Sequence, residues 1–497
     1  MSLSRRDFLK LGSATAVAVS ASACSAVGRQ VAQNQLPETL APPNRTSSDT
    51  LWRLLNRAGY GPRPGDYEQA QEIGLEAYLE EQLHPDTIED SAANLLIRNL
   101  TLYPMDIDQL LGQEERDATQ ELTWATAARA IYSRRQLYEA MVEFWSDHFN
   151  IYLRKNQVMP LLKLVDDRDV IRPHALGSFR DLLTASAHSP AMLAYLDNTR
   201  NVAGDVNENY ARELMELHTL GVNGGYTQQD VQEMARALTG WTVGRRGRNQ
   251  GKFQFTAEQH DKAAKTVFGL SLPAGQGAKD VDDVLAMLAA HPATAEFIAT
   301  KLVRRFVADD PPASLVAQVS QTFLQTDGNI KAMLRVIFLS DEFAAAPPKL
   351  KRPYTFMVSA LRAVGADVGV SRELGNWLRR LGQPLFHWPP PDGYPDTAAD
   401  WAANLLPRWN FALALVNGRI PRTTAPLTDL AQSANVDSGT AVLDLFAGLT
   451  LGRSLTPAEV QPFTTYVGSA PLDNPATRQR LHDAVALLLA SPAFQWT

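Results

Sequence analysis

Residues 207–241 constrain the fold of this chain most, because they carry the pattern of two helices joined by a tight turn. The first helix begins near Asn207. Gly221 stands where a glycine commonly ends a helix, and the Asn-Gly-Gly run that follows tolerates positive φ angles. Thr227 and Asp230 then match a capping box, with Asp in place of the usual Glu, and apolar residues recur at helical spacing beyond them. The stretch therefore predicts a helical hairpin.

The first helix of this hairpin separates an apolar face from a polar face when its residues are placed about 100° apart. The polar face carries Asn209, Arg212, Glu213 and Glu216. Two carboxylates, a guanidinium and an amide on one face could bind a divalent metal ion and an oxygen-rich substrate. The same face contains i,i+4 charge pairs, which are typical of a solvated, salt-bridged helix, so both interpretations remain open.

Two further groups of residues carry side chains suited to metal binding or acid-base chemistry. Glu143 and Asp147 share a helix face at i,i+4 spacing, and His148 follows them. His260 and Asp261 are adjacent, and a carboxylate beside an imidazole can orient it for metal binding or proton transfer. In each group a purely structural role is the competing interpretation.

A proline-rich passage, HWPPPDGYPDTAADW, occupies residues 387–401. Its proline and glycine content excludes regular structure, and loops of this kind commonly wall binding clefts. Trp388 and Tyr394 in this passage are therefore candidate substrate-binding residues. The alternative is a strap that packs over the helical core.

Elsewhere the chain alternates helical patterns with Gly/Pro turns, from about Thr50 to the C-terminus. The alternation of Phe253 and Phe255 within KFQFT is the clearest strand-like signal. We therefore expect a mainly α, multi-helical globular protein with at most a small β-hairpin. Residues 50–497 form one helical domain in this prediction, with a subdomain break near 345 as an open alternative.

The first 24 residues have the pattern of an export signal. Arg5 and Arg6 precede an Asp-Phe-Leu-Lys run and an alanine-rich apolar stretch, which is the pattern read by the twin-arginine (Tat) export machinery. Two ways of processing remain open. Cys24 becomes the lipidated first residue of the mature protein, or the signal is removed by ordinary cleavage after Ala23 without lipidation. We expect residues 25–49 to be a flexible linker. The protein is therefore predicted to be periplasmic, with membrane contact only through the signal or a lipid anchor.

Composition limits the possible functions. The chain has 47 basic and 54 acidic residues and a net charge of −7, and this balance argues against a nucleic-acid binder. Hydrophobic residues make up 45% of the chain, which suffices for a substantial core. Cys24 is the only cysteine, so we expect no intramolecular disulfide, no thiol catalysis and no cysteine metal site.

The chain resembles the large bacterial family called domain of unknown function 1800. The resemblance lies in blocks that occur in order: LLNRAGYGPRPGD, FWSDHFNI, the hairpin stretch, FQFTAEQHD, KLVRRFVADDPP, LFHWPPPDGYPD and RWNFAL. It implies an exported, mainly helical bacterial protein without an established reaction. It also implies a partner, because genes of this family often lie beside those of a second exported family that is similar to alkaline phosphatases and sulfatases.

Two functional hypotheses follow. In the first, the protein is a metal-dependent envelope enzyme, a hydrolase or an oxidoreductase, in which Asp261 orients His260. The candidate ligands of its divalent metal are Glu213, Glu216, His148 and His260, the candidate catalytic residues are His148, Arg212 and Asp261, and the candidate substrate-binding residues are Asn209, Arg212, Trp388 and Tyr394. In the second, the same side chains form a satisfied network in a non-catalytic periplasmic scaffold or partner protein.

Overall fold

The computed structural model describes residues 25–42, 47–437, 439–467 and 474–497 of the chain. Over these residues the fold is mainly α-helical, which confirms the predicted fold class, with short strands in small antiparallel pairs. The predicted export signal, including Cys24, lies outside the described residues.

The elements follow one another in three groups. The first comprises α2 Thr50–Arg57, α3 Asp66–Ile73, α4 Leu75–Leu83, α5 Ser91–Arg98, α6 Ile107–Leu110, α7 Glu115–Tyr132, α8 Gln136–His148, α9 Met159–Asp166, α10 Arg172–His174, α11 Phe179–Ala187 and α12 Pro190–Tyr195. The second comprises α13 Asn209–Glu213, α14 Gln228–Ala237, β1 Trp241–Val243, β2 Phe253–Phe255, β3 Lys265–Val267, β4 Leu270–Leu272, α15 Lys279–Ala289, α16 Pro292–Phe306, α17 Ala313–Gln325, α18 Ile330–Phe338 and α19 Asp341–Ala344. The third comprises α20 Pro353–Ala363, β5 Asp367–Val368, α21 Glu373–Leu381, α22 Ala398–Trp401, α23 Leu405–Val416, β6 Thr423–Thr424, α24 Leu427–Ser433, α25 Gly439–Leu451, α26 Pro457–Val467, α27 Pro475–Ala490 and α28 Pro492–Gln495.

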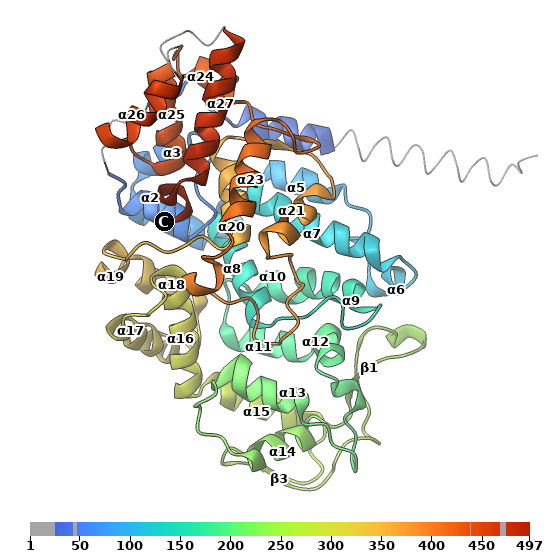
Figure 1. Ribbon diagram of the computed structural model, residues 1–497. Helices are drawn as coiled ribbons and strands as arrows, with labels where there is room; N and C mark the ends of the chain where they lie inside the picture. The colour runs from blue at the N-terminus through green and yellow to red at the C-terminus, as the bar shows by residue number, and fades with distance from the viewer. Residues whose placement is uncertain (1–24, 43–46, 438, 468–473) are drawn as a thin grey trace, which may run out of the picture.

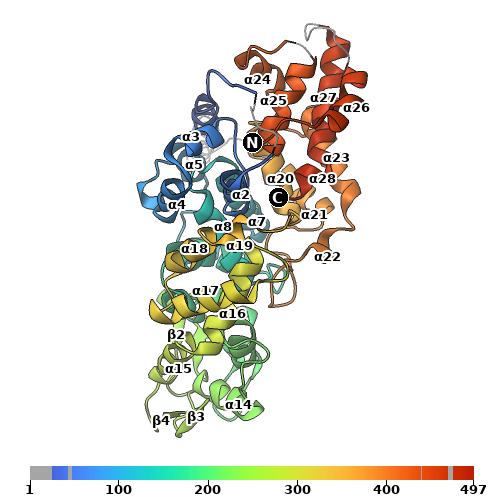
Figure 2. The same cartoon turned by 90° about the vertical axis from the view of Figure 1, so that its left-hand side faces the viewer.

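The helices from the two ends of the chain share one end of the molecule. Figures 1 and 2 show α2 to α5 beside the C-terminal helices α24 to α27, while α14, α15 and strand β3 lie at the opposite end. Helices α8 and α16 lie between these two ends. The middle of the molecule is therefore built from segments that are far apart in the sequence.

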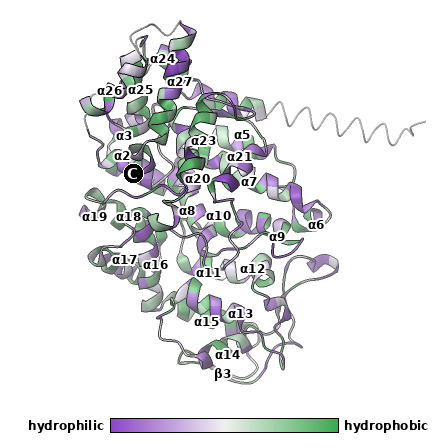
Figure 3. Cartoon of the chain, viewed as in Figure 1, coloured by the Kyte–Doolittle hydropathy of each residue, from purple (hydrophilic) through white to green (hydrophobic). Residues whose placement is uncertain are grey.

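One hydrophobic cluster extends from Ala32 to Phe494 and joins these groups of helices. Every residue of α20 except Thr355 is buried, and Figure 3 shows the hydrophobic colour of this helix. The subdomain break that the sequence leaves open near 345 stays a prediction. No helix among the described residues combines the length and the apolar content needed to cross a membrane.

Residues 25–34 are helical, whereas the sequence predicts a flexible linker over 25–49. Arg29 pairs with Asp367 at 2.7 Å, and the side chain of Gln33 donates to a backbone carbonyl in the turn after α20. Gly28 and Ala32, one helical turn apart, are buried, and an added Cβ at Gly28 would lie 3.1 Å from a leucine of α5. Small residues at this spacing allow two helices to pack closely. The polar composition of residues 25–49 gives no indication of this packing, so the sequence predicts a linker.

The predicted hairpin at 207–241 is present. The capping box of Thr227 and Asp230 is formed, and Gly221 has a φ of +79°. The first helix, however, changes after Glu213 into a π-helical turn over residues 214–219. A π turn holds more residues than an α turn, so side chains beyond it point in directions that a regular 100° wheel does not give.

The strand-like KFQFT run forms β2, which pairs antiparallel with β1 so that Trp241 lies opposite Phe255. The structure adds the pairs β3–β4 and β5–β6 to the single hairpin that the sequence predicts. These strands span two or three residues each, too few to show an alternating pattern.

Candidate functional site

Helix α8 ends beneath the proline-rich strap, which we define as residues 387–401. Asn150, just beyond the helix, donates to the carbonyls of two strap residues at 2.9 and 2.7 Å. Gly393 has a φ of +78°, and an added Cβ there would lie 2.1 Å from the carbonyl oxygen of Asp147. The strap therefore packs directly on the end of α8, and glycine at 393 permits this approach.

A cavity of about 190 Å³, which we call the α8–α16 cleft, lies between the end of α8, helix α16 and the strap. Three of the predicted site residues line it: His148, Trp388 and Tyr394. The two aromatic rings pack together with centroids 5.1 Å apart, so they form one wall of the cleft. The other lining side chains are charged for the most part and include Asp147, Lys301, Arg304, Arg305, Arg352, Asp392 and Asp396.

His148 is held at both ring nitrogens. Its Nδ1 accepts a hydrogen bond from the ammonium of Lys301 over 3.0 Å, and its Nε2 donates to the carbonyl of His218 over 3.1 Å. Burial, followed by the nearby charge of Lys301, holds the pKa of His148 well below its usual range. The imidazole is therefore neutral, and both of its nitrogens are already engaged.

Burial also lowers the pKa of Lys301 to about 8, while three aspartates of the cleft partly oppose this effect. Within the described part of the chain, no ion pair joins the Lys301 ammonium to a carboxylate. Its hydrogen-bond partner is the neutral His148. At neutral pH the cleft consequently contains an ammonium that lacks a directly paired negative charge.

Arg305 and Arg352 differ from Lys301 because carboxylates neutralise them, whereas Arg304 donates to the backbone carbonyl of Asp309 over 3.2 Å. Glu143 accepts from Arg305 at 3.0 Å and also from Arg352, and the hydroxyl of Tyr60 donates to it at 2.7 Å. Arg352 also pairs with Asp147 at 2.7 Å. Burial would raise the pKa of Asp396, but Arg305, Arg352 and a nearby lysine outweigh burial and lower it. Glu143 thus connects α8 to the basic side chains around it.

Glu213 and Glu216 lie on the hairpin with partly exposed side chains. Burial and the charge of Glu216 raise the pKa of Glu213, and Asp392 of the strap adds to the increase. The hydroxyl of Tyr226 donates to Glu216 over 3.3 Å. The charges of Glu216 and Asp392 therefore both act on Glu213, and we call the part of the hairpin that carries Glu213 and Glu216 its acidic surface.

The two predicted substrate-binding residues of the hairpin make local contacts. Arg212 donates to Glu208 at 3.1 Å and to Gln228 at 3.0 Å. Asn209 donates to the carbonyl of Leu196 over 3.2 Å. These contacts match the salt-bridged helix face that the sequence left open as an interpretation.

His260 is buried and contacts Asp280 rather than its neighbour Asp261. Its Nδ1 lies 2.9 Å from the carbonyl of Thr239, and its Nε2 lies 3.2 Å from the carboxylate of Asp280. Asp261 instead pairs with Arg236 at 2.8 Å. The carboxylate that orients His260 is therefore contributed by α15, and adjacency in the sequence pointed to the wrong aspartate.

Among the residues that the structure describes, no group of three or more His, Cys, Asp or Glu side chains is placed to hold a metal ion. Glu213, Glu216, His148 and His260 are thus not gathered into one site in this arrangement. The divalent metal stays a prediction, and of its candidate ligands only Glu213 and Glu216 share a surface.

Sequence reasoning missed the basic residues of the cleft. Lys301, Arg304 and Arg305 follow one another at i, i+3 and i+4 on α16, within the KLVRRF block. This spacing places them on one helix face. This spacing indicates a basic helix face. It does not indicate that His148 of α8 lies opposite that face.

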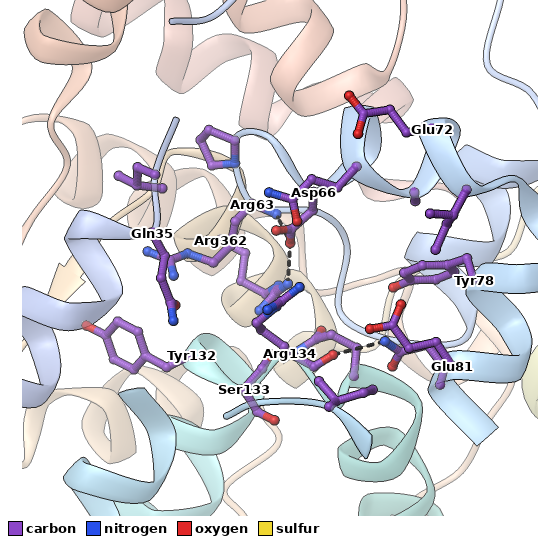
Figure 4. A pocket seen from close by; sticks show the side chains of 18 residues that line it. Gln35, Arg63, Asp66, Glu72, Tyr78, Glu81, Tyr132, Ser133, Arg134 and Arg362 are labelled. Atoms are coloured by element: carbon purple, nitrogen blue, oxygen red, sulfur yellow. Dashed lines mark hydrogen bonds and ion pairs between the residues drawn. The ribbon is translucent and has the colours of Figure 1, made fainter. Parts of the chain in front are cut away.

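A second cavity, of about 350 Å³, lies near the N-terminal helices and is drawn in Figure 4. Its central cation, Arg362, is already satisfied. The guanidinium donates to the carbonyls of Gly61 at 2.6 Å and Ile131 at 2.7 Å, and it pairs with Asp66 at 2.9 Å. Arg362 thus links α20 to α3, to α7 and to the turn before α3, which is a structural role.

Comparison with known proteins supports the resemblance found in the sequence. No curated protein and no solved structure gives a significant match to this chain. The family model described as "Protein of unknown function (DUF1800)" matches residues 53–496. These residues include α8, the hairpin, α16 and the strap, so the whole candidate site falls within the match. The chain therefore belongs to the DUF1800 family of proteins of unknown function.

Proposed function

We propose that this protein is exported by the twin-arginine route and serves in the cell envelope as a non-catalytic binding protein. In this proposal the α8–α16 cleft captures one anionic group of a ligand, such as a carboxylate, a phosphate or a sulfate. The observation that carries the proposal is the Lys301 ammonium, which is hydrogen-bonded to a neutral histidine and has no ion-pair partner in the described chain.

The charge state of Lys301 supports anion binding at neutral pH. With a pKa of about 8 the side chain is mainly protonated at pH 7. An ammonium carries three donors, of which one points to His148. A bound anion would accept another donor and would offset the charge in a site partly shielded from water, where electrostatic attraction is strengthened.

The contacts of the histidines favour this proposal over catalysis. His148 has both ring nitrogens engaged, and both nitrogens of His260 lie against fixed partners. A general base or a metal ligand needs a free lone pair directed at its target. The two histidines instead match the satisfied network expected of a scaffold or binding protein.

Isothermal titration calorimetry with sodium sulfate, phosphate and acetate at pH 7 tests anion capture. We expect one site with a dissociation constant of about 1 mM or tighter for at least one of these anions. Lys301→Met should abolish this binding. Lys279→Met is the matched control, because Lys279 is 63% exposed and already pairs with Asp283. Equal binding by both variants and the unaltered protein would refute the proposal.

The export proposal is supported by the Arg5-Arg6 pattern and is tested separately. Replacing both arginines by lysine should retain the protein in the cytoplasm, whereas the unaltered chain should reach the periplasm. On the basis of the family resemblance we further propose that the protein has a co-exported partner similar to phosphatases or sulfatases. Such enzymes act on phosphate or sulfate esters, and a protein that holds an anionic ester is a suitable companion; co-purification of the two exported proteins tests this.

The acidic surface of the hairpin favours one second candidate, the metal-dependent enzyme. Glu213 has a pKa raised by burial and by Glu216, and such a repulsion between carboxylates is relieved when a divalent cation binds between them. Elemental analysis of protein purified without a histidine tag or chelator decides between the candidates. Near-stoichiometric iron, manganese, zinc or calcium that is lost in Glu213→Ala would support the enzyme. If the folded protein contains no metal, the metal-dependent enzyme is excluded and the anion-binding protein remains as the proposal.

A further inference from the structure

Another cavity lies beside the start of the strap, and its lining residues differ from those of the α8–α16 cleft. It has a volume of about 820 Å³ and is formed by the first half of α7, the loop before α9, α21, residues just before the strap and the first strap residue, His387. Ligand pockets commonly have volumes of roughly 300–1,000 Å³, so this cavity can hold a sizeable ligand. None of its lining residues lines the cleft around Lys301.

The charge of this cavity opposes the charge of the chain. Four arginines line it, all of them exposed: Arg116, Arg154, Arg372 and Arg379. Glu115 is the one acidic lining residue, whereas the whole chain has a net charge of −7. A local excess of guanidinium groups on an acidic protein attracts anionic ligands and repels cationic ones.

Carboxylates do not neutralise these arginines among the described residues. Arg372 donates to the amide oxygen of Gln120 at 2.8 Å, and Arg379 donates to the amide oxygen of Asn376. Both partners are neutral. The guanidinium groups therefore keep their charge and most of their donors for a ligand, and planar guanidinium groups bind carboxylates and sulfates with two parallel hydrogen bonds.

His387 lies at the wall of the cavity, where the charges of two of the arginines act on it. Its pKa is lowered by burial and then by the charges of Arg154 and Arg379, so both guanidinium groups lie near the ring. The Nδ1 of His387 lies 2.7 Å from the carbonyl of Leu385, which fixes the ring at the cavity wall. Two of the four positive groups of the cavity, Arg154 and Arg379, therefore act on the part of the wall that His387 forms.

The uncharged lining suits a ligand rich in hydroxyl groups. Trp124 is 3% exposed, and its indole Nε1 is buried without a hydrogen-bond partner among the described residues. Because this N–H is inaccessible, Trp124 contributes to the cavity wall through its ring. Amide and hydroxyl side chains, such as those of Asn156 and Thr123, also line the cavity and can donate to or accept from sugar hydroxyls.

We propose that this cavity binds a segment of an acidic polysaccharide, with the arginines pairing with its carboxylate or sulfate groups and the amide and hydroxyl side chains of the lining contacting its hydroxyl groups. The inference goes beyond the proposed function, because it concerns a second site with its own residues. It assigns the protein a polymer ligand of the envelope rather than a small anion alone.

Affinity electrophoresis through gels that contain polygalacturonate, dextran sulfate or neutral dextran tests this proposal. We expect retardation by at least one of the two acidic polymers and none by neutral dextran. Preference between the first two distinguishes uronate from sulfate groups. Retardation by neutral dextran as strong as by the acidic polymers would overturn the proposal, and so would retardation by polyglutamate equal to that by both acidic polysaccharides.

Paired variants locate the site. Arg154→Ala with Arg379→Ala should weaken polymer binding about tenfold, as expected when two charge-assisted contacts are lost. Arg419→Ala with Arg480→Ala removes the same charge from exposed positions outside the cavity and should have little effect. Equal weakening by both pairs would show non-specific attraction and would overturn the assignment.

Gln157→Ala tests the contribution of an exposed amide of the lining. We expect several-fold weaker binding of the acidic polymer with an unchanged fold by circular dichroism. Lys301→Met serves as the reference between the two sites, because it should abolish binding of small anions and leave polymer retardation intact. If Lys301→Met alone removed polymer binding and the arginine pair did not, the polymer site would be the wrong cavity.

Discussion

The ammonium of Lys301 donates a hydrogen bond to Nδ1 of His148 over 3.0 Å, which joins helix α16 to the last residue of α8. The other imidazole nitrogen donates to the carbonyl of His218. Burial and these two contacts therefore keep the histidine neutral and fixed, and the lysine remains a charged group of the cleft that is not ion-paired. In our proposal Lys301 of α16 is therefore the residue that binds the ligand, and His148 holds the lysine side chain in position.

Neutralising Glu143 should lower the free energy of unfolding strongly. Its side chain is 6% exposed and accepts hydrogen bonds from Arg305, Arg352 and Tyr60. Glu143→Gln leaves one buried and one largely buried guanidinium group with less compensating charge, so we expect the free energy of unfolding to fall by about 3–5 kcal/mol.

Urea denaturation of Glu143→Gln measures this loss. Glu76→Gln, an exposed change on α4, is the control and should shift the free energy of unfolding by less than about 0.5 kcal/mol. A loss below about 1 kcal/mol for Glu143→Gln would mean that solvent replaces the missing charge.

Acid should destabilise the protein through its buried histidines. Burial lowers the pKa of His218 to about 3, whereas an unfolded histidine has a pKa of about 6.5. The folded state keeps the ring neutral while the unfolded state takes up a proton. The stability from this group is present above pH 6.5 and is lost as the pH falls toward 3, by up to about 1.4 kcal/mol per pH unit.

Denaturation curves between pH 7 and pH 4 check the histidine prediction. His218→Gln should give a flatter dependence of stability on pH, and His84→Gln, at an exposed position, should leave the dependence unchanged. The same slope in all three proteins would contradict the assignment.

Lys351 should oppose stability at neutral pH. Burial, followed by the charge of Arg408, holds the pKa of Lys351 well below its usual range, and its ammonium donates to Ser359 at 2.8 Å. Because the folded pKa is depressed, the unfolded state binds the proton more tightly, and stability rises as the pH increases toward about 10.4. Lys351→Met should therefore raise the free energy of unfolding by about 1 kcal/mol at pH 7, with a smaller gain near pH 10.

Comparison of Lys351→Met with Lys279→Met by urea denaturation at pH 7 and pH 10 checks this sign. Lys279 is exposed, so its replacement should change little at either pH. A loss of stability in Lys351→Met that is the same at both pH values would show that its contact with Ser359 outweighs the burial of its charge.

Gly393 should be essential for the position of the strap. An added Cβ would lie 2.1 Å from the carbonyl oxygen of Asp147, and the residue has a positive φ. Gly393→Ala should displace the strap, lower the melting temperature and weaken anion binding in the cleft about tenfold. Gly418→Ala is the matched control, since Gly418 also has a positive φ but nothing lies within 4 Å of its added Cβ. Equal effects in both variants would indicate backbone strain alone.

Local features of the fold could be predicted from the sequence. The capping box of Thr227 and Asp230, the turn at Gly221 and strand β2 depend on neighbouring residues, and all three are present. The π turn after Glu213 has no such local signature. It changes the directions of Glu216 and the following residues, which a regular helical wheel misplaces.

The partners of the site residues could not be predicted in the same way. Lys301 is 153 residues from His148, and Asp280 is 20 residues from His260. Spacing along the chain identifies which side chains share a helix face, but it does not tell which two faces meet. The sequence therefore supplied His148, Trp388 and Tyr394 as candidates and gave no reason to connect them to α16.

The pKa of Lys301 tests anion capture most directly. NMR of side-chain-labelled lysines, with Lys301→Met to identify the signal, gives this value with and without sulfate. We expect a pKa of about 8 in the free protein. Sulfate should raise the pKa, because an anion that binds the ammonium favours its charged form and the two equilibria are linked. A pKa near that of an unperturbed lysine, about 10.4, that sulfate does not change would contradict the proposal.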